Sequence, residues 1–277
     1  MLFSRVRAQS RFVVLAPHRN SESRIFRNLE YDNGWYDGLL ADMQRLRGRV
    51  YLNDGAIRAE ELTSDGRHTI TIDESSWHVL ALDAKDRVFA CLRYLDENRA
   101  SRFDDLWVRH AAITKSPMLG RSFRHAVESE MENARRLDLR FGEVGGWAAS
   151  PDYHRTIEPV RIILAAYGLL GLLGGCAGVA TATMRHGSAH ILRRIGLSPL
   201  AHGGNELPAY YDPYYRCEME VLRFDSRRPN PKYRGAISEL TSILAESPVI
   251  CRESLRTSLQ SVLRGAPAEA PGLVTAA

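Results

Sequence analysis

The sequence predicts a single α/β domain, and two patterns along the chain favour that fold class. The first is an apolar helical pattern at 162–173 that stops at a glycine pair and leads into the β-prone run CAGVATATM at 176–184. A helix, a glycine stop and a buried strand follow one another in the crossover of a parallel sheet. The second pattern is a pair of strand-like runs at 76–82 and 87–95, which a short polar turn joins as in a β-hairpin.

The composition agrees with a water-soluble protein that buries a sizeable core. The chain has 277 residues, of which 44% are hydrophobic and 25% are charged, as in ordinary globular domains. A formal net charge of only +4 argues against nucleic acid as the main partner. The four cysteines form no C-x-x-C pair, and the first residues contain only a four-residue apolar run. These features favour a reducing compartment and no secretory signal, so we expect a cytoplasmic protein.

The first elements can be assigned from periodicity. Residues 1–34 are rich in arginine and show little periodicity, so an irregular basic segment is predicted there. The folded domain is expected to span 35–264, because no internal repeat or long linker divides it. A helix is predicted over 35–47, where apolar residues recur on one stripe. Strand patterns follow at 68–73, 76–82 and 87–95.

The remaining elements alternate between helix and strand. Pro117 can open a helix that continues to residue 137. The tail 265–277 is rich in alanine and proline and is expected to be disordered. The elements predicted between them are a strand at 139–149, a helix at 153–173, a strand at 176–184, a short helix closed by Gly196, a strand in RCEMEVLRF, and helices at 232–245 and 251–263.

Several other sites and a membrane span are weighed and set aside. The uncharged run Ile162–Met184 is long enough for a membrane span, but its glycine interruption and β-prone second half favour a buried helix and strand. His186 and His190 have the spacing of zinc ligands on a helix, yet no glutamate accompanies them, so no metal site is predicted. Glycine-rich nucleotide-phosphate motifs and the G-x-S-x-G elbow are missing from the sequence.

The strand at 139–149, LRFGEVGGWAA, holds the most informative residue, Glu143. Side chains alternate along a strand, so Glu143 is expected to share one face with Leu139, Phe141 and Trp147. A carboxyl group among large apolar side chains has a raised pKa, which suits a general base near neutral pH. The alternatives are a glutamate paired with a nearby arginine and a glutamate that faces solvent at a sheet edge.

The glycine pair that follows Glu143 strengthens the case for a reactive site. Gly145 and Gly146 stand inside the strand pattern, where paired glycines mark a β-bulge or the close approach of a ligand. A bulge releases backbone N–H groups from the ladder, and such donors can hold a thioester carbonyl as it becomes an oxyanion. An acid one step before a bulge is therefore interpreted as an acyl-transfer centre.

The order of these segments resembles the GNAT-type N-acyltransferases, and within them the autoinducer synthase and N-acyl amino acid synthase branch. The likeness covers roughly residues 35–225 and is carried by RGRVYLNDGAI, FGEVGGWAASPDYH, CAGVATATM and IGLSPL. It implies a GNAT-like fold with a mixed, mostly antiparallel central sheet flanked by helices, splayed between the strands at 139–149 and 176–184. The pantetheine arm of the donor would lie in the splay. The implied activity is transfer of a fatty acyl group from a thioester to the amine of an amino acid or similar small acceptor.

Site residues follow from the resemblance position by position. Glu143 matches the acid of the branch's E-x-x-R-[FW] strand motif, which implies the catalytic base. Trp147 matches its aromatic position. The segment expected to bind the acyl donor is Gly145, Gly146, Trp147 and Ala148. The implied substrate-binding residues are Arg93 in CLRYL, and Arg45 and Tyr51 in R-x-x-x-x-V-Y. Each has a structural alternative: Trp147 and Tyr51 as core aromatics, and Arg93 as a surface partner of Asp96 or Glu97.

Two departures from the family pattern bear on the substrates. Gly146 stands where the autoinducer synthases carry arginine, which favours a plain N-acyl amino acid over an acyl-homoserine-lactone signal. The segment 152–158 lacks the glycine-rich pyrophosphate loop of relatives that use coenzyme A. An acyl carrier protein is therefore the preferred donor, with acyl-CoA as the alternative and no bound cofactor. A non-catalytic module that binds acyl chains remains a second hypothesis.

Two further groups of residues have both functional and structural interpretations. Four arginines around the helix at 117–137 can meet an acidic carrier protein or form a solvated face: Arg121, Arg124, Arg135 and Arg136. A cluster of tyrosines before the closing strand can protonate a leaving thiolate or pack as an aromatic loop, and the second interpretation is favoured: Tyr210, Tyr211, Tyr214 and Tyr215.

Overall fold

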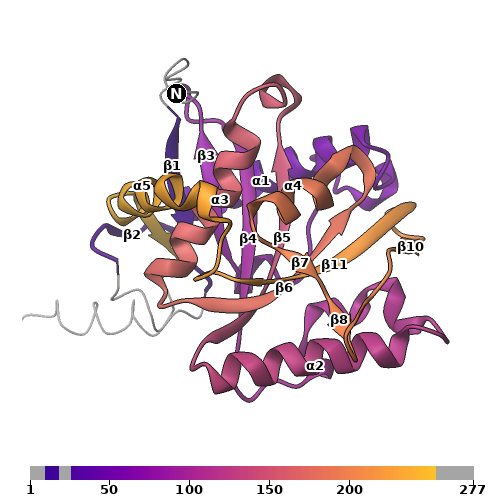
Figure 1. Ribbon diagram of the computed structural model, residues 1–277. Helices are drawn as coiled ribbons and strands as arrows, with labels where there is room; N and C mark the ends of the chain where they lie inside the picture. The colour runs from indigo at the N-terminus through magenta and orange to yellow at the C-terminus, as the bar shows by residue number, and fades with distance from the viewer. Residues whose placement is uncertain (1–9, 19–25, 254–277) are drawn as a thin grey trace, which may run out of the picture.

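A computed structural model describes residues 10–18 and 26–253 of the chain. Its centre is a 10-stranded sheet with helices on both faces (Figure 1). Along the sheet the strands are β10 (Tyr210–Asp212), β11 (Cys217–Asp225), β6 (Cys176–Thr183), β5 (Arg140–Ala149), β4 (Val88–Glu97), β3 (Trp77–Leu82), β1 (Arg11–Leu15), β12 (Val249–Cys251) and β2 (Leu29–Tyr31), and β7 (Ser198–Pro199) also pairs with β11.

The sheet is mixed, and most of its strand pairs are antiparallel. Parallel pairing occurs between β5 and β6, between β1 and β12 and between β12 and β2. The hairpin of β3 and β4 is antiparallel and closes through a short turn, with Leu82 opposite Val88. A separate two-stranded hairpin is formed by β8 (Ala201–His202) and β9 (Asn205–Glu206). These pairings confirm the predicted class of a mixed, mostly antiparallel α/β sheet.

Helices cover the two faces in different ways. One face is covered by α3 (Glu158–Leu172), α4 (Ser188–Ile195) and α5 (Arg234–Ala245), whose buried residues join one large hydrophobic cluster. The other face carries α1 (Asn33–Asn53) over β1, β3 and β4, and α2 (Gly120–Arg136) over β5, β6 and β11. Two separate hydrophobic clusters lie under these helices, because α1 and α2 cover different halves of that face. Figure 1 shows α1 behind the sheet and α3 in front of it.

The apolar run that raised the question of a membrane span is part of the core. Residues 162–170 of α3 are all buried, and the glycine pair ends the helix before β6 enters the sheet. Among the described residues, no helix is long and apolar enough to cross a bilayer. The predicted order of helix, glycine stop and buried strand is confirmed.

The strands β5 and β6 diverge along their length. They pair in parallel from Arg140 opposite Cys176 to Val144 opposite Ala180, and their pairing ends there. Beyond this point β5 continues to Ala149 alongside β4, while β6 continues to Thr183 alongside β11. The predicted splay between these strands is therefore confirmed, and its fork lies beside Glu143.

Several predicted elements need correction. Residues 1–34 are not irregular throughout: β1 is buried in the sheet and β2 lies at its edge. The run RFVVL is short, and partners far away in the chain stabilise it as a strand. The pattern at 68–73 is not a strand, because Asp73 turns inward to meet polar groups of α1. A helix was predicted at 251–263, but Cys251 belongs to β12 instead. Residues 254–263 lie outside the described residues, together with the tail 265–277.

Three helices differ from their predicted bounds. α1 continues six residues past the predicted end at residue 47, since its apolar stripe includes Val50. α2 begins at Gly120, after a hydrogen-bonded turn at 117–119 that starts with Pro117, and α3 begins at Glu158, after a 3-10 turn at Pro151–Tyr153. The first turn after a proline is thus not yet α-helical in either case. The helix predicted over 232–245 is α5, and the short helix before Gly196 is α4.

Candidate active site

Glu143 lies on β5 with its carboxyl group buried beside the fork of the sheet. The residue is 5% exposed, and its Oε1 atom accepts a hydrogen bond of 2.6 Å from the backbone N–H of Trp107. Burial raises the pKa of Glu143 to about 7, although that hydrogen bond and the positive charge of Arg93 oppose the change. A carboxyl group that titrates near neutral pH can accept a proton at physiological pH.

The β4–β5 register places two charged residues diagonally beside Glu143. Leu95 lies directly opposite Glu143, while Arg93 pairs with Gly145 and Glu97 pairs with Phe141. Residues in diagonal positions on one face are about 7–8 Å apart at their Cα atoms, within reach of long side chains. Glu143 therefore has a guanidinium group on one side and a second carboxyl group on the other.

Arg93 is a buried cation with an unsatisfied donor. It is 5% exposed, and its Nε atom has no hydrogen-bond partner among the described residues. Burial and the nearby Arg47 lower the pKa of Arg93. Neither Asp96 nor Glu97 forms an ion pair with it in the described part of the chain. The acidic groups that act on Arg93 are Asp73, which is paired with Arg47, and Glu143, whose pKa is about 7. A buried guanidinium group without an ion pair of its own is costly, so this position is suited to a negatively charged ligand.

A β-bulge at Gly146 shapes the backbone next to Arg93. Cys91 pairs with Ala148 and Arg93 with Gly145, so two residues of β5 oppose one of β4. Gly146 has φ +62°, and a Cβ atom there would lie 3.3 Å from Cβ of Arg93. The predicted bulge is confirmed. It also reverses the side chain that follows: Trp147 packs with Val144 against the α3 side of the sheet, so the expected shared face with Glu143 is wrong.

The arginine that α1 brings to this place is Arg47 and not Arg45. Arg45 lies on the outer side of the helix, where it pairs with Asp42 and Asp65 at 2.9 Å each. Arg47 is fully buried, and its Nη1 would lie 3.6 Å from a Cβ atom on Gly146. Sequence reasoning missed Arg47, although it falls on the same helical stripe as Leu39 and Met43.

The carboxylate of Asp73 holds the Arg47 guanidinium group in place. Both oxygens of Asp73 accept hydrogen bonds from the guanidinium group, at 2.9 and 2.6 Å. Asp73 also accepts a hydrogen bond of 3.0 Å from Gln44 on the same helix. The hydrogen bonds to Arg47 and its positive charge lower the pKa of Asp73 against the opposing effect of burial. Arg47 is therefore neutralised within the protein, whereas Arg93 is not.

Aromatic side chains close the site on the side of α1. The ring of Tyr51 lies 5.6 Å from that of His68 and 6.4 Å from that of Tyr215, and Tyr214 packs edge-on against Tyr215. The Tyr51 hydroxyl lies 3.5 Å from the carbonyl oxygen of Trp147, within the bulge. These ring contacts support the prediction of a packed aromatic loop, and they bring Tyr51 to the same place as Gly146.

The N-terminus of α3, which follows β5, carries a carboxylate of the chain itself. Glu158 is the first residue of the helix, is 7% exposed, and pairs with Arg161 at 3.3 Å. Its carboxylate also accepts a hydrogen bond of 3.4 Å from the Ser10 hydroxyl. Pro159 removes one of the free N–H groups of the first turn. This helix end is therefore poorly suited to hold a pyrophosphate group.

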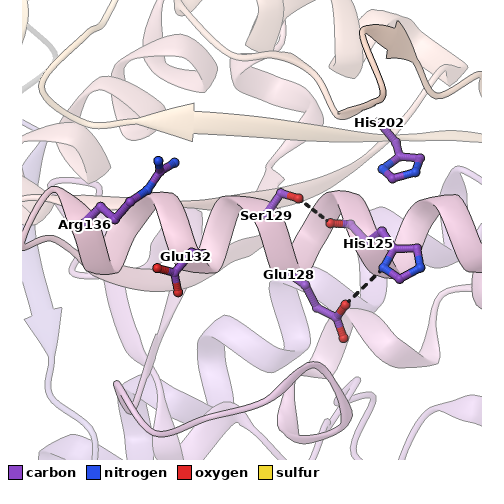
Figure 2. Close-up of a pocket in the computed structure, with 6 residues that line it drawn as sticks. All are labelled: His125, Glu128, Ser129, Glu132, Arg136 and His202. Atoms are coloured by element: carbon purple, nitrogen blue, oxygen red, sulfur yellow. Dashed lines mark hydrogen bonds and ion pairs between the residues drawn. The ribbon is translucent and has the colours of Figure 1, made fainter.

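A hollow of about 680 Å³ lies elsewhere, on the outer side of α2 (Figure 2). Figure 2 shows His202 of β8 facing His125, with Glu128 and Glu132 along the helix. The hollow includes Arg136, one of the four arginines interpreted either as a contact for a carrier protein or as part of a solvated helix face. None of its lining residues belongs to the site around Glu143. Within the described ranges, no cluster of His, Cys, Asp and Glu side chains that could hold a metal ion is present.

Two of the four arginines around α2 already have partners in the chain. Arg124 pairs with Asp104 and, at 3.6 Å, with Glu128. Arg135 pairs with Glu132 at 3.5 Å and donates to backbone carbonyl groups. Their charge is therefore largely balanced within this surface.

The strand order and the fork beside Glu143 agree with the GNAT-like fold that the sequence predicts. No family model matches the chain, and no curated protein matches it in sequence. Among solved structures, a CoA-dependent acyl-homoserine lactone synthase, BjaI, with SAM and isopentyl-CoA has a TM-score of 0.51 at 16% identity, covering 92% of this chain and 99% of that chain. The same protein with MTA gives a TM-score of 0.50. This likeness establishes the fold, and the site residues stand on the geometry described above.

Proposed function

We propose that the protein is an N-acyltransferase that moves an acyl group from a thioester to the amine of a small acceptor. The observation that carries the proposal is the position of Glu143, a buried carboxyl group at the point where β5 and β6 separate. A fork in a sheet exposes backbone groups of both strands to a ligand, which can pair with them as an added strand does. A thioester that enters the fork meets a base at its inner end.

The chemistry assigned to Glu143 is removal of a proton from the acceptor's ammonium group. The free amine then attacks the thioester carbonyl carbon, the C–N bond forms, and the C–S bond breaks. A pKa near 7 for Glu143 fits this task, because the base is partly ionised at neutral pH. The bulge at Gly146 lies beside the attacked carbonyl in this arrangement, and its backbone is the proposed source of oxyanion donors.

The acceptor is proposed to carry a carboxylate, as an amino acid does. Arg93 is buried and its Nε lacks a partner among the described residues, and a guanidinium group recognises a carboxylate through paired hydrogen bonds. Tyr51 and Tyr215 provide ring surface next to it. The proposed substrate-binding residues are thus Arg93 and Tyr51. Arg47, which takes the place expected for Arg45, is paired with Asp73 and supports the site next to Gly146.

A specific observation keeps a second acceptor in view. The BjaI structure of TM-score 0.51 contains SAM together with an acyl-CoA. SAM also has an amine and a carboxylate, so the charge of Arg93 suits it as well as an amino acid. The products differ: an amino acid gives a linear N-acyl amino acid, whereas SAM gives an acyl-homoserine lactone after ring closure.

The donor is proposed to be an acyl carrier protein. The buried Glu158 carboxylate and Pro159 at the start of α3 disfavour a pyrophosphate group there. A carrier protein presents a single phosphate on its pantetheine arm and needs no pyrophosphate cradle. Coenzyme A is the alternative, as BjaI is CoA-dependent, and it would have to place its pyrophosphate away from this helix end.

The test is an assay of purified protein with acyl carrier protein and acyl-CoA thioesters of several chain lengths, offered amino acids or SAM, with products identified by mass spectrometry. We expect N-acyl amino acids. Glu143→Gln should lower turnover about 10²-fold or more, whereas Glu239→Gln, on the exposed side of α5, should leave it unchanged. Bound fatty acid without product from any acceptor would instead indicate a non-catalytic acyl-binding module.

A further inference from the structure

The proposed reaction releases one proton for each acyl group transferred. An acceptor enters as an ammonium ion, with three protons on nitrogen, and leaves as an amide with one. The leaving thiolate takes up one of the two protons lost, and the other is left on Glu143. Because Glu143 is 5% exposed, this proton needs a route to solvent before the next turnover.

Glu97 stands between Glu143 and the surface. It lies at the end of β4, opposite Phe141, on the same face as Glu143 and on the side away from Arg93. This diagonal position brings its carboxyl group within reach of that of Glu143, and each of the two groups shifts the pKa of the other. Glu97 is itself only partly buried, and the next residues along the chain, Asn98 to Ala100, are exposed. The two carboxyl groups thus form a short path from a buried base to water.

We propose, on the basis of the N-acyltransferase function above, that Glu97 is a proton relay that takes the proton from Glu143 and releases it to solvent. In the balanced step, the O–H bond of protonated Glu143 breaks as an O–H bond forms on the Glu97 carboxylate. Glu97 then gives that proton to water, and both carboxyl groups return to their starting states. No other reactant is needed. Glu97 does not contact the acceptor in this scheme and acts through Glu143.

The charges around the pair favour such a transfer. Arg93 attracts negative charge to Glu143 from one side. Asp96 and Asp105 lie on the side of Glu97 and, with burial and Glu143, raise the pKa of Glu97 to about 8. The Ser101 hydroxyl donates a hydrogen bond of 3.4 Å to Glu97 and partly opposes this rise. Both carboxyl groups therefore exchange protons near neutral pH, and neither is held permanently in one state.

Two variants at Glu97 separate a relay from a structural hydrogen bond. Glu97→Gln keeps a donor of similar shape beside Glu143 but cannot pass a proton on, and Glu97→Ala removes the group and leaves space. A relay predicts that both variants lose about 10-fold or more in kcat, with KM for the acceptor unchanged. Added formate should restore part of the activity of Glu97→Ala, since a small carboxylate can enter the space, and should not restore that of Glu97→Gln.

The results of these assays distinguish a proton relay from a structural hydrogen bond. Full activity of Glu97→Gln would overturn the relay, since a structural hydrogen bond is retained in that variant. Equal losses with no rescue by formate, and with an unchanged pH profile, would also overturn it. An inactive wild-type enzyme would refute the proposed function and the relay with it. If Glu97→Ala fails to fold, the kcat and pH profile of Glu97→Gln still decide the matter, with Glu239→Gln as the matched control on α5.

Discussion

The raised pKa of Glu143 should make the protein less stable as the pH rises. The folded-state pKa is about 7, against the ordinary value of 4.5 in an unfolded chain. Between these two values the native state holds a proton that the unfolded state has lost, so the free energy of unfolding falls with pH. At about 1.4 kcal/mol for each pKa unit, the loss is about 3 kcal/mol by pH 8. Glu97 adds to the slope in the same direction, because its pKa is raised as well.

Glu143→Gln isolates the contribution of Glu143. The amide has the shape of the protonated carboxyl group, and its oxygen can still accept the hydrogen bond from the Trp107 N–H. We expect Glu143→Gln and wild type to have similar stability at pH 4.5 and the variant to be more stable by about 3 kcal/mol at pH 8. The same substitution removes the proposed base, so the more stable protein should be the inactive one.

Urea unfolding at pH 4.5, 6, 7 and 8, followed by circular dichroism, measures this difference. Glu239→Gln, which changes an exposed carboxylate on α5, provides the control for loss of one negative charge. A stability difference between Glu143→Gln and wild type that stays constant across the pH range would refute the reasoning. It would mean that Glu143 titrates alike in the folded and unfolded chains.

Three further substitutions test the remaining parts of the site. Gly146→Ala forces a side chain into φ +62° and against Arg93. It should lower the free energy of unfolding by about 1–2 kcal/mol, measured by thermal unfolding. The control Gly235→Ala, in open space on α5, should leave the stability unchanged or raise it. Arg47→Met leaves the buried Asp73 without its cation. We expect the free energy of unfolding, measured by urea titration, to fall by about 3–5 kcal/mol. A smaller loss would contradict the structural role of the Arg47–Asp73 pair. Arg93→Gln should raise the KM for a carboxylate-bearing acceptor, with little loss of stability because Arg93 forms no ion pair with another described residue. An unchanged KM would argue against the proposed acceptor site.

Local sequence patterns were sufficient to predict the hairpin of β3 and β4, the strand β5 and the crossover from α3 to β6. In each, the pattern of apolar residues and the position of glycines lie within a short stretch of chain. The buried carboxyl group of Glu143 and the bulge at Gly146 were also predictable. Side-chain alternation and paired glycines report on the strand itself, without knowledge of its neighbours.

Where contacts between distant segments decide the structure, prediction from sequence was incomplete. The strand β1 looked like part of an irregular basic segment, because its pairing partners are β3 and β12, the latter more than 200 residues away. The run at 68–73 alternates like a strand, yet a buried ion pair between Asp73 and Arg47 holds it in a turn. Periodicity does not report such long-range pairing.

The sequence by itself determined the class of fold, the strand that carries the proposed base and the place where that strand bulges. These features depend on alternation and on glycine, which act within a few residues. Only the tertiary structure decided that Arg47 lies at the site while Arg45 faces outward, that Arg93 is buried without an ion pair among the described residues, and that Glu97 lies diagonally beside Glu143. These facts depend on the orientation of α1 and on the register of β4 against β5. The pKa of a carboxyl group depends on its neighbours, and those neighbours are in place only once the sheet has formed.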